Sequence, residues 1–178
     1  MKSVMISIRP EWCAKIANGE KTIEVRKTKP KLETPFKCYI YCTLAGSNKL
    51  FKETLGGDIA KWNREKWADR KGNVIGEFVC DDITYFGNVA TDPWKYLLGA
   101  VHEEYKRLIT EEALLTEEEI LQYKGRYGWH ISALVIYDRP KKINEFVSAS
   151  IANTNCFGEQ WHLLDRPPQS WCYVKKGH

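Results

Sequence analysis

Residues 7–26 read SIRPEWCAKIANGEKTIEVR, and this stretch decides the fold that the sequence predicts. Pro10 fits the first turn of a helix, where its missing N–H is not needed, and Gly19 supplies the left-handed residue that commonly ends one. Apolar and polar residues then alternate over 21–27, which is typical of a strand with one buried face. The stretch therefore predicts a short helix over about 10–18, followed at once by a strand.

The predicted strand carries opposite charges on one face. Ile23 and Val25 fall on the core side, so Thr22, Glu24 and Arg26 fall together on the other. Successive residues on one face are about 7 Å apart, which allows Glu24 and Arg26 to pair or to share a ligand. The planar fork of Arg26 suits a phosphate or the edge of a base.

Further strands follow along the chain, separated by irregular connections and two helical segments. The 178 residues fit one domain, spanning 1–178, with predicted insertions at about 49–70 and 92–124. Regular alternation of strands and helices is missing, which disfavours a doubly wound sheet. The sequence therefore predicts an α+β fold, a small mixed β-barrel with flanking short helices and helical insertions. The other predicted strands are 4–8, 38–44, 74–80, 129–137 and 169–174.

Composition and charge leave several classes of function without support. The net charge of +4 and a pI of about 8.6 permit attraction to nucleic acid without requiring it. No glycine-rich phosphate loop is present, so no nucleotide cofactor is expected. The six cysteines form no CxxC pair, and the four histidines show no shared spacing, so no metal is expected.

No segment predicts a membrane partner or an export signal. The apolar run at the N-terminus is short and interrupted, and no later stretch approaches the ~20 apolar residues that cross a bilayer. We therefore expect a cytoplasmic protein with reduced thiols. Nothing in the sequence decides its oligomeric state.

Two neighbouring motifs resemble the signature of ASCH domains, a group of PUA-like β-barrels. One is Ser7–Glu11, where the first strand meets the helix, and the other is Gly19–Arg26, which has the spacing GxKxxExR. Later segments agree with the resemblance, which covers most of the chain outside the two predicted insertions. These segments are Val74–Phe78, Trp129–Ile131, Tyr137–Pro140 and Pro167–Trp171.

The resemblance implies a cleft beside the first helix that holds RNA or a modified nucleoside. The Lys, Glu and Arg of the motif, Lys21, Glu24 and Arg26, would line it, and Arg9 would join them in holding phosphate or base oxygens. The predicted function is therefore binding of RNA or of a nucleobase-like small molecule.

Tryptophans could supply a stacking ring, because one base on an aromatic ring gains ~1–3 kcal/mol. Trp12 and Trp129 lie among apolar residues, which favours the core for both. Trp171 is the better candidate for the edge of a binding site, and Gln169 and Ser170 before it could read a base edge by hydrogen bonding.

An enzyme is the alternative that the sequence leaves open, either an amidohydrolase on an acylated nucleoside or a ribonuclease. A desolvated Lys21 could lose its proton and act as nucleophile or base, with Glu24 or Glu77 moving protons. Related amidohydrolases use a Lys and a Thr of this strand with a distant Glu. The position of that Thr is Glu24 here, and Thr22 is on the same face. Full exposure of Lys21 would contradict this alternative.

The predicted insertions carry two further hypotheses. An apolar stripe from Trp94 to Leu108 could serve as a protein-interaction surface, although burial against the barrel is the more common use of such a stripe. Trp62 and Trp67, among basic residues of 49–70, would suit a flap over nucleic acid.

Overall fold

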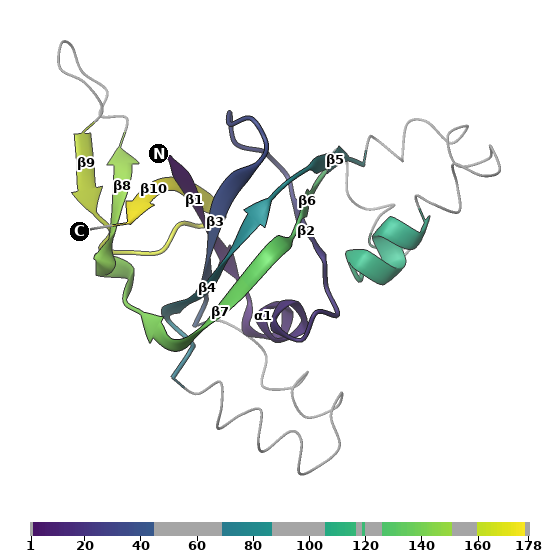
Figure 1. The fold of residues 1–178 in the computed structure, drawn as a ribbon, viewed down its shortest axis with the longest axis horizontal. Coiled ribbons are helices and arrows are strands. Elements are labelled where there is room, and N and C mark those ends of the chain that lie inside the picture. The colour runs from purple at the N-terminus through teal and green to yellow at the C-terminus, as the bar shows by residue number, and fades with distance from the viewer. Residues whose placement is uncertain are drawn as a thin grey trace. The chain divides into compact units, whose positions relative to one another are not determined.

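The structure, a computed structural model, describes residues 2–44, 69–86, 106–116, 119, 126–150 and 160–176. The chain divides into two compact units, each described by itself below. Unit 1 comprises Met1–Ala14, Lys37–Phe78 and Leu134–His178, and unit 2 comprises Lys15–Phe36 and Val79–Ala133. Strands dominate both, with few helices, so the α+β class is confirmed (Figure 1). The organisation of 1–178 as a single domain stays a prediction.

Unit 1 is built on a seven-stranded sheet of order β7-β4-β3-β1-β10-β8-β9. The central strand β1 runs parallel to β3 and antiparallel to β10. Among the described residues the sheet is open, with β7 and β9 at its edges, so closure into a barrel is not confirmed. The strands are β1 (Ser3–Ile8), β3 (Phe36–Cys42), β4 (Asn73–Cys80), β7 (Ser132–Lys141), β8 (Phe146–Ser150), β9 (Gln160–Leu163) and β10 (Trp171–Lys176).

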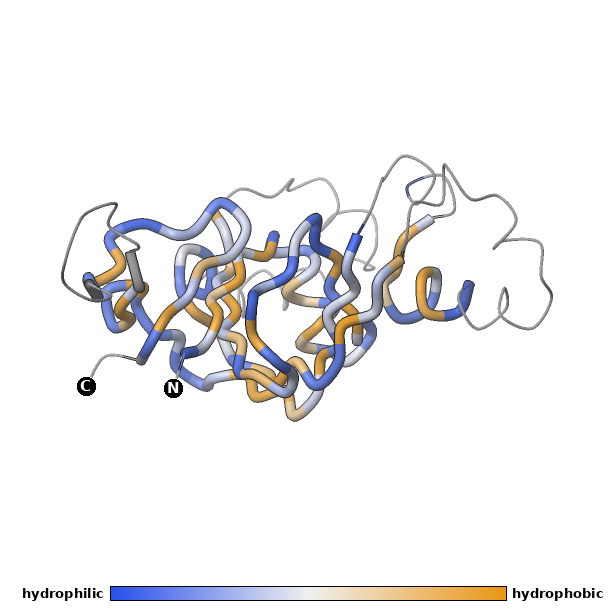
Figure 2. The backbone as a smooth tube through the Cα atoms, turned by 90° about the horizontal axis from the view of Figure 1, so that it is seen from above, coloured by the Kyte–Doolittle hydropathy of each residue, from blue (hydrophilic) through white to orange (hydrophobic). Residues whose placement is uncertain are grey.

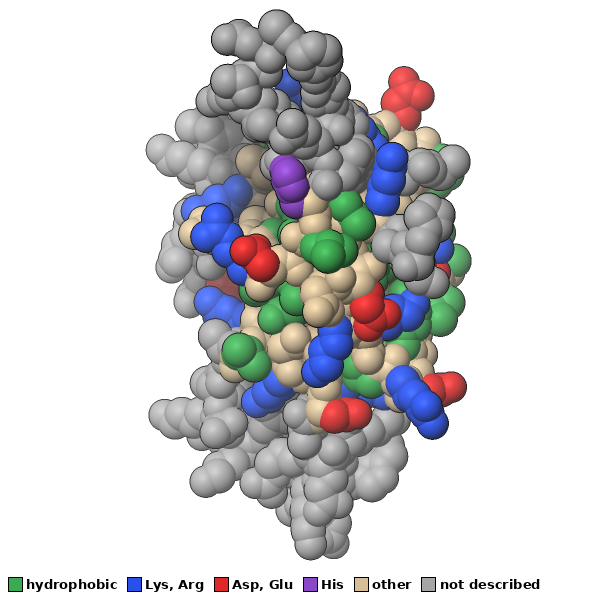
Figure 3. Space-filling model, turned by 90° about the vertical axis from the view of Figure 1, so that its left-hand side faces the viewer, with side chains coloured by type: hydrophobic (Ala, Val, Ile, Leu, Met, Phe, Trp, Pro, Cys, Tyr) green, Lys and Arg blue, Asp and Glu red, His purple; other side chains and the backbone are tan. Residues whose placement is uncertain are grey.

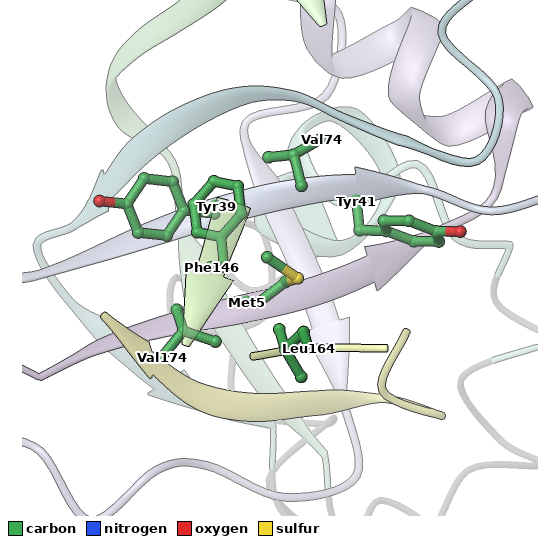
Figure 4. Packing of buried hydrophobic residues seen from close by; sticks show 7 residues of the cluster. All are labelled: Met5, Tyr39, Tyr41, Val74, Phe146, Leu164 and Val174. Atoms are coloured by element: carbon green, nitrogen blue, oxygen red, sulfur yellow. The ribbon is translucent and has the colours of Figure 1, made fainter. Parts of the chain in front are cut away.

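The core of unit 1 packs around β1, all of whose side chains are buried. Tyr39 of β3 and Phe146 of β8 meet edge to face, with ring centroids 4.8 Å apart. This geometry is the one that aromatic quadrupoles favour. The side chains of the cluster point toward one another (Figure 4) and are Met5, Tyr39, Tyr41, Val74, Phe146, Leu164 and Val174.

Unit 2 contains a three-stranded sheet of order β2-β6-β5, formed by Ile23–Arg26, Tyr127–His130 and Ile83–Tyr85. One core cluster of this unit contains Ile23, Phe86, Ile109 and Ala113. Ile109 belongs to a one-turn π-helix, η2 (Leu108–Glu112). A Cβ on Gly128 of β6 would lie 2.6 Å from the Phe86 ring and 2.9 Å from the Ile23 methyl, so these side chains would have to shift.

The predicted first helix is confirmed as α1 (Pro10–Ala17), which buries Cys13 and Ile16. Gly19, at φ 76°, ends it as the sequence predicts. Thr116 and Glu119 form a capping box, exchanging hydrogen bonds of 2.9 and 3.2 Å. Most of the two predicted insertions, 49–70 and 92–124, lies outside the described residues.

The prediction of one strand over 129–137 is wrong. The segment contains the end of β6 and the start of β7, which belong to different sheets. Only Ile131 separates the two strands, and Ala133, near the start of β7, has a φ of 45° that a regular strand does not allow. Apolar residues on both sides of this break hid it, and β5, β8 and β9 were also not predicted. Hydrophobic and hydrophilic stretches alternate along the chain (Figure 2), but these three strands are too short to show a period.

A short 3-10 turn, η3 (Ile143–Glu145), joins β7 to β8 in unit 1. The Glu145 side chain accepts a hydrogen bond of 2.7 Å from the backbone N–H of Lys142, which secures the start of the turn. Across the described residues, no helix is long and apolar enough to span a bilayer.

Candidate functional site

The three charged residues of the GxKxxExR motif lie together in unit 2. Glu24 Oε1 forms an ion pair with Arg26 Nη2 at 3.0 Å, and Glu24 Oε2 lies 3.8 Å from Lys21 Nζ. Only 4%, 10% and 14% of the side chains of Lys21, Glu24 and Arg26 are exposed, in that order. We call these three residues the charged cluster. A nearly buried carboxylate is thus held between two cations, as the strand parity of Glu24 and Arg26 allows.

The end of α1 and the residues after η2 position Lys21. The backbone N–H groups of Glu20 and Lys21 both donate to the Lys15 carbonyl, which fixes the turn after the helix. Lys21 Nζ donates a hydrogen bond to the carbonyl oxygen of Ala113. The Thr22 N–H donates to the Glu112 carbonyl at 3.0 Å, so the two segments are joined at successive residues.

Burial is the main influence on the charge of Lys21. Desolvation lowers the pKa of the amine below its ordinary value, and the carboxylate of Glu24 opposes that effect without cancelling it. Arg26 and Lys15 lower the pKa further by repulsion. Lys21 is therefore not the fully exposed lysine that would contradict the enzyme alternative.

Thr22, the candidate to replace the threonine of the related hydrolases, directs its hydroxyl to Glu112. Its side chain is exposed, and its hydroxyl donates to Glu112 Oε2 at 3.3 Å. Sequence analysis missed both Glu112 and Ala113, because they fall in a segment that the resemblance treats as an insertion. Besides the pairing of β2 with β6, these two residues add hydrogen bonds between the motif and the segment around η2.

The remaining predicted site residues lie in unit 1, at the carboxyl end of β1. The Ser170 carbonyl accepts a hydrogen bond of 2.9 Å from the Ser7 N–H, and Trp171 opposes Ile6 across the strands. Gln169 is exposed, and Trp171 is half-buried with its ring edge-on to that of Tyr173. Arg9 is exposed just beyond β1. The predicted residues thus form two groups, one in each unit.

Trp129 is a core residue, as predicted. Its side chain is completely buried and meets Phe36 edge to face, with ring centroids 5.9 Å apart. In the sheet register Trp129 opposes Glu24, so its ring lies on the same face as the charged cluster. Trp12 is half-buried on α1.

Glu77, the other predicted proton carrier, is held as a carboxylate in unit 1. Lys37 Nζ donates to its Oε1 at 2.6 Å and Tyr137 Oη to its Oε2 at 2.5 Å. Burial favours the neutral acid, but these two hydrogen bonds and the charges of Lys37 and Lys141 outweigh it and lower the pKa of Glu77. Such a group is a poor proton donor near neutral pH.

Tyr137→Phe is expected to lower the free energy of unfolding by about 1–2 kcal/mol at pH 7, because a hydrogen bond to a charged acceptor is lost. The folded-state pKa of Glu77 is lowered, so its stabilising contribution is present above the unfolded pKa and fades as the pH falls through the folded value. The difference between variant and wild type should therefore shrink below about pH 4. Urea denaturation at several pH values measures it, with Tyr85→Phe as the control; an equal loss at all pH values would contradict the assignment.

The cysteine thiols that the structure describes are free, and most are buried. Burial raises the pKa of Cys80 to about 12 and that of Cys172 to about 11, so neither is a reactive thiolate near neutral pH. The thiol of Cys156 lies outside the described residues. The described ranges contain no cluster of three His, Cys, Asp or Glu residues that could hold a metal ion.

Comparisons with known proteins find similarity at the level of solved structures. No family model matches the chain, and no curated protein matches it. A tyrosine-to-phenylalanine variant of the ASCH protein from Zymomonas mobilis is 18% identical, with a TM-score of 0.49, covering 99% of this chain and 92% of that one. The unmodified ASCH protein of that organism is 19% identical, with a TM-score of 0.46, covering 98% of this chain and 88% of that one. The chain is thus similar to ASCH proteins, the group that its motif resembles.

Proposed function

We propose that this chain binds a nucleobase-like ligand, carried by RNA or by a modified nucleoside, through the charged cluster. The observation that supports this proposal best is the arrangement of Lys21, Glu24 and Arg26, in which a carboxylate is held between two cations with at most 14% of any of these side chains exposed. The cluster offers both an acceptor and donors at one place. A base edge presents the same mixture of groups.

Each residue of the charged cluster has a role in this proposal. Glu24 accepts a hydrogen bond from an exocyclic amine, while Arg26 and Lys21 donate to a base oxygen or ring nitrogen. Removal from water strengthens such hydrogen bonds and makes an unmatched group costly, which gives selectivity. The small exposed area favours a flat base edge over a bulky phosphodiester.

The unit 1 group extends the proposal. Arg9 could hold a phosphate, Gln169 and Ser170 could read a second edge, and the Trp171 ring could stack. Their grouping at the end of β1 supports a common role. A cytoplasmic location, where RNA is available and thiols stay reduced, belongs to the same proposal and is supported by the free thiols of unit 1 and unit 2.

Hydrolysis of an acylated nucleoside is the second candidate, favoured by the burial of Lys21 and its lowered pKa. A neutral Lys21 amine can take a proton from water as the water oxygen attacks the acyl carbon. The carbon–nitrogen bond then breaks, and the proton returns from Lys21 to the departing amine. Glu24 would orient the lysine, in the position where related hydrolases have a threonine. A ribonuclease would use the same base to take the proton of a ribose hydroxyl.

Titration of the protein with unmodified nucleosides, acylated nucleosides and short RNAs, followed for both binding and new products, tests the proposal. Arg26→Gln is expected to weaken binding of the best ligand at least about 10-fold, because it removes a charged donor worth ~1.4 kcal/mol or more. Lys21→Met is expected to weaken it as well, and to abolish any product. Lys15→Met, which changes a more exposed lysine of the same segment, is the matched control.

The outcomes separate the two candidates. Ligand binding without new products supports a binding module. Products that form with the wild-type protein and disappear in Lys21→Met make the chain a hydrolase. Failure of the wild-type protein to bind any member of the panel at low salt would refute the proposed function.

A further inference from the structure

The three-stranded sheet of unit 2 presents a row of side chains that the core does not use. The register pairs Arg26 with Tyr127 and Tyr127 with Tyr85, and directly opposed residues project from the same face of a sheet. Glu24 is two residues before Arg26, so it shares this face. The hydrophobic core of unit 2 contains Ile23, which lies on the opposite face.

The two tyrosines of this row form an accessible aromatic surface. Tyr85 is 55% exposed, and its ring centroid lies 5.1 Å from that of Tyr127. Lys29 Nζ lies 5.7 Å from the Tyr127 ring centroid, within the range of a cation–π contact. We call Arg26, Tyr127 and Tyr85 the aromatic row.

A strongly basic segment borders the aromatic row. Residues 26–31 contain four cations and no acid, and the three lysines among them are exposed. On the face that Figure 3 shows, basic side chains are scattered and acidic ones lie between them. Concentrated positive charge beside exposed aromatic rings is the combination that binds single-stranded nucleic acid. The four cations are Arg26, Lys27, Lys29 and Lys31.

We propose that one base of a single-stranded RNA reaches the charged cluster and that the aromatic row stacks the neighbouring bases of the same RNA. The lysines of 26–31 then hold the phosphates of that RNA. This inference rests on the proposed function and deepens it, because it makes the ligand a polynucleotide and not a free nucleoside. Three positions across neighbouring strands span about 10 Å. That length accommodates two to three stacked nucleotides at a rise of ~3.4 Å.

Fluorescence anisotropy with a labelled single-stranded RNA of about 8 nucleotides tests the inference, alongside titration with the best nucleoside. Tyr85→Leu and Tyr127→Leu are each expected to weaken RNA binding roughly 10-fold, the loss of one stacked base, and to change nucleoside binding less than about 2-fold. Tyr85→Phe keeps the ring and should retain RNA binding. Lys29→Gln should reduce the slope of log affinity against log salt by about 1.

Two exposed residues of unit 1 supply matched controls. Leu163→Ala removes an exposed apolar side chain, and Lys142→Gln removes an exposed charge; neither should alter RNA binding or its salt dependence. Because Tyr85 is mostly exposed, its replacement should also leave the unfolding transition in place, which circular dichroism checks. Loss of RNA binding therefore reports on stacking.

The outcomes distinguish this inference from the function on which it rests. RNA binding that depends on Arg26 but is unchanged in Tyr85→Leu and Tyr127→Leu overturns the claim that the aromatic row stacks bases. The proposed function then stays in place. Equal loss of nucleoside and RNA binding in the tyrosine variants also overturns it, because the rings would then serve the charged cluster alone. Absence of both kinds of binding in the wild type overturns both proposals.

Discussion

Glu24→Ala is expected to lower the free energy of unfolding by about 3 kcal/mol. The substitution leaves Lys21 and Arg26 facing each other with no carboxylate between them. Removing one partner of a buried ion pair lowers the free energy of unfolding by about 3–5 kcal/mol. We expect the lower end of that range. Burial lowers the pKa of Lys21 and Glu24 opposes that lowering, so without Glu24 the amine loses its proton more readily and part of the repulsion disappears.

Urea denaturation followed by tryptophan fluorescence measures this loss. Glu20→Ala is the matched control, because Glu20 lies in the same motif and pairs with Lys15, but its side chain is 51% exposed. An exposed pair of this kind contributes about 0–1 kcal/mol. If Glu24→Ala were no more destabilising than Glu20→Ala, the account of the charged cluster as a nearly buried unit would be contradicted.

Gly76→Ala is expected to destabilise unit 1 by about 3 kcal/mol, at the upper end of the range for an overpacked site. A Cβ on Gly76 would overlap the backbone carbonyl oxygen of Val135 and lie 3.2 Å from the Cα of Ile136. Both atoms belong to the backbone of β7, which pairs with β4 in the sheet. Backbone cannot rotate away as a side chain can, so the two strands must separate locally.

Two other glycines set the scale for this prediction. Gly128→Ala meets the Phe86 ring and an Ile23 methyl, which are side-chain atoms that can shift, so its cost should be smaller than that of Gly76→Ala. Gly19→Ala meets no atom within 4 Å, and its positive φ alone should cost about 1 kcal/mol. Thermal unfolding of the three variants measures the order, and a Gly76→Ala protein as stable as Gly19→Ala would show that β4 and β7 do not approach this closely.

Local rules were enough to predict the elements that carry the motif. The Pro10 start and the Gly19 end of α1 depend only on neighbouring residues, and so does the alternation that places Glu24 and Arg26 on one face. The structure reproduces each of these features. Burial of Trp129 followed from its apolar neighbours in the same way.

The missed features depend on contacts between distant parts of the chain. Lys21 is buried because the carbonyl of Ala113 lies over it, 92 residues away, and no local pattern encodes that contact. The break between β6 and β7 was hidden because Ile131 and Leu134 continue the apolar run across it. The aromatic row was missed because Tyr85 and Tyr127 are neighbours only through the pairing of β5 with β6.

NMR spectroscopy of the Lys21 and Arg26 side chains during titration with the best nucleoside tests the central claim most directly. The account predicts that the resonances of the Lys21 ε-methylene and the Arg26 guanidinium shift together as the ligand is added, with the same midpoint as the binding curve. Those of Lys142 and Arg139, which are exposed in unit 1, should not shift. Saturable binding that leaves the Lys21 and Arg26 resonances unchanged would contradict the charged cluster as the site of ligand binding.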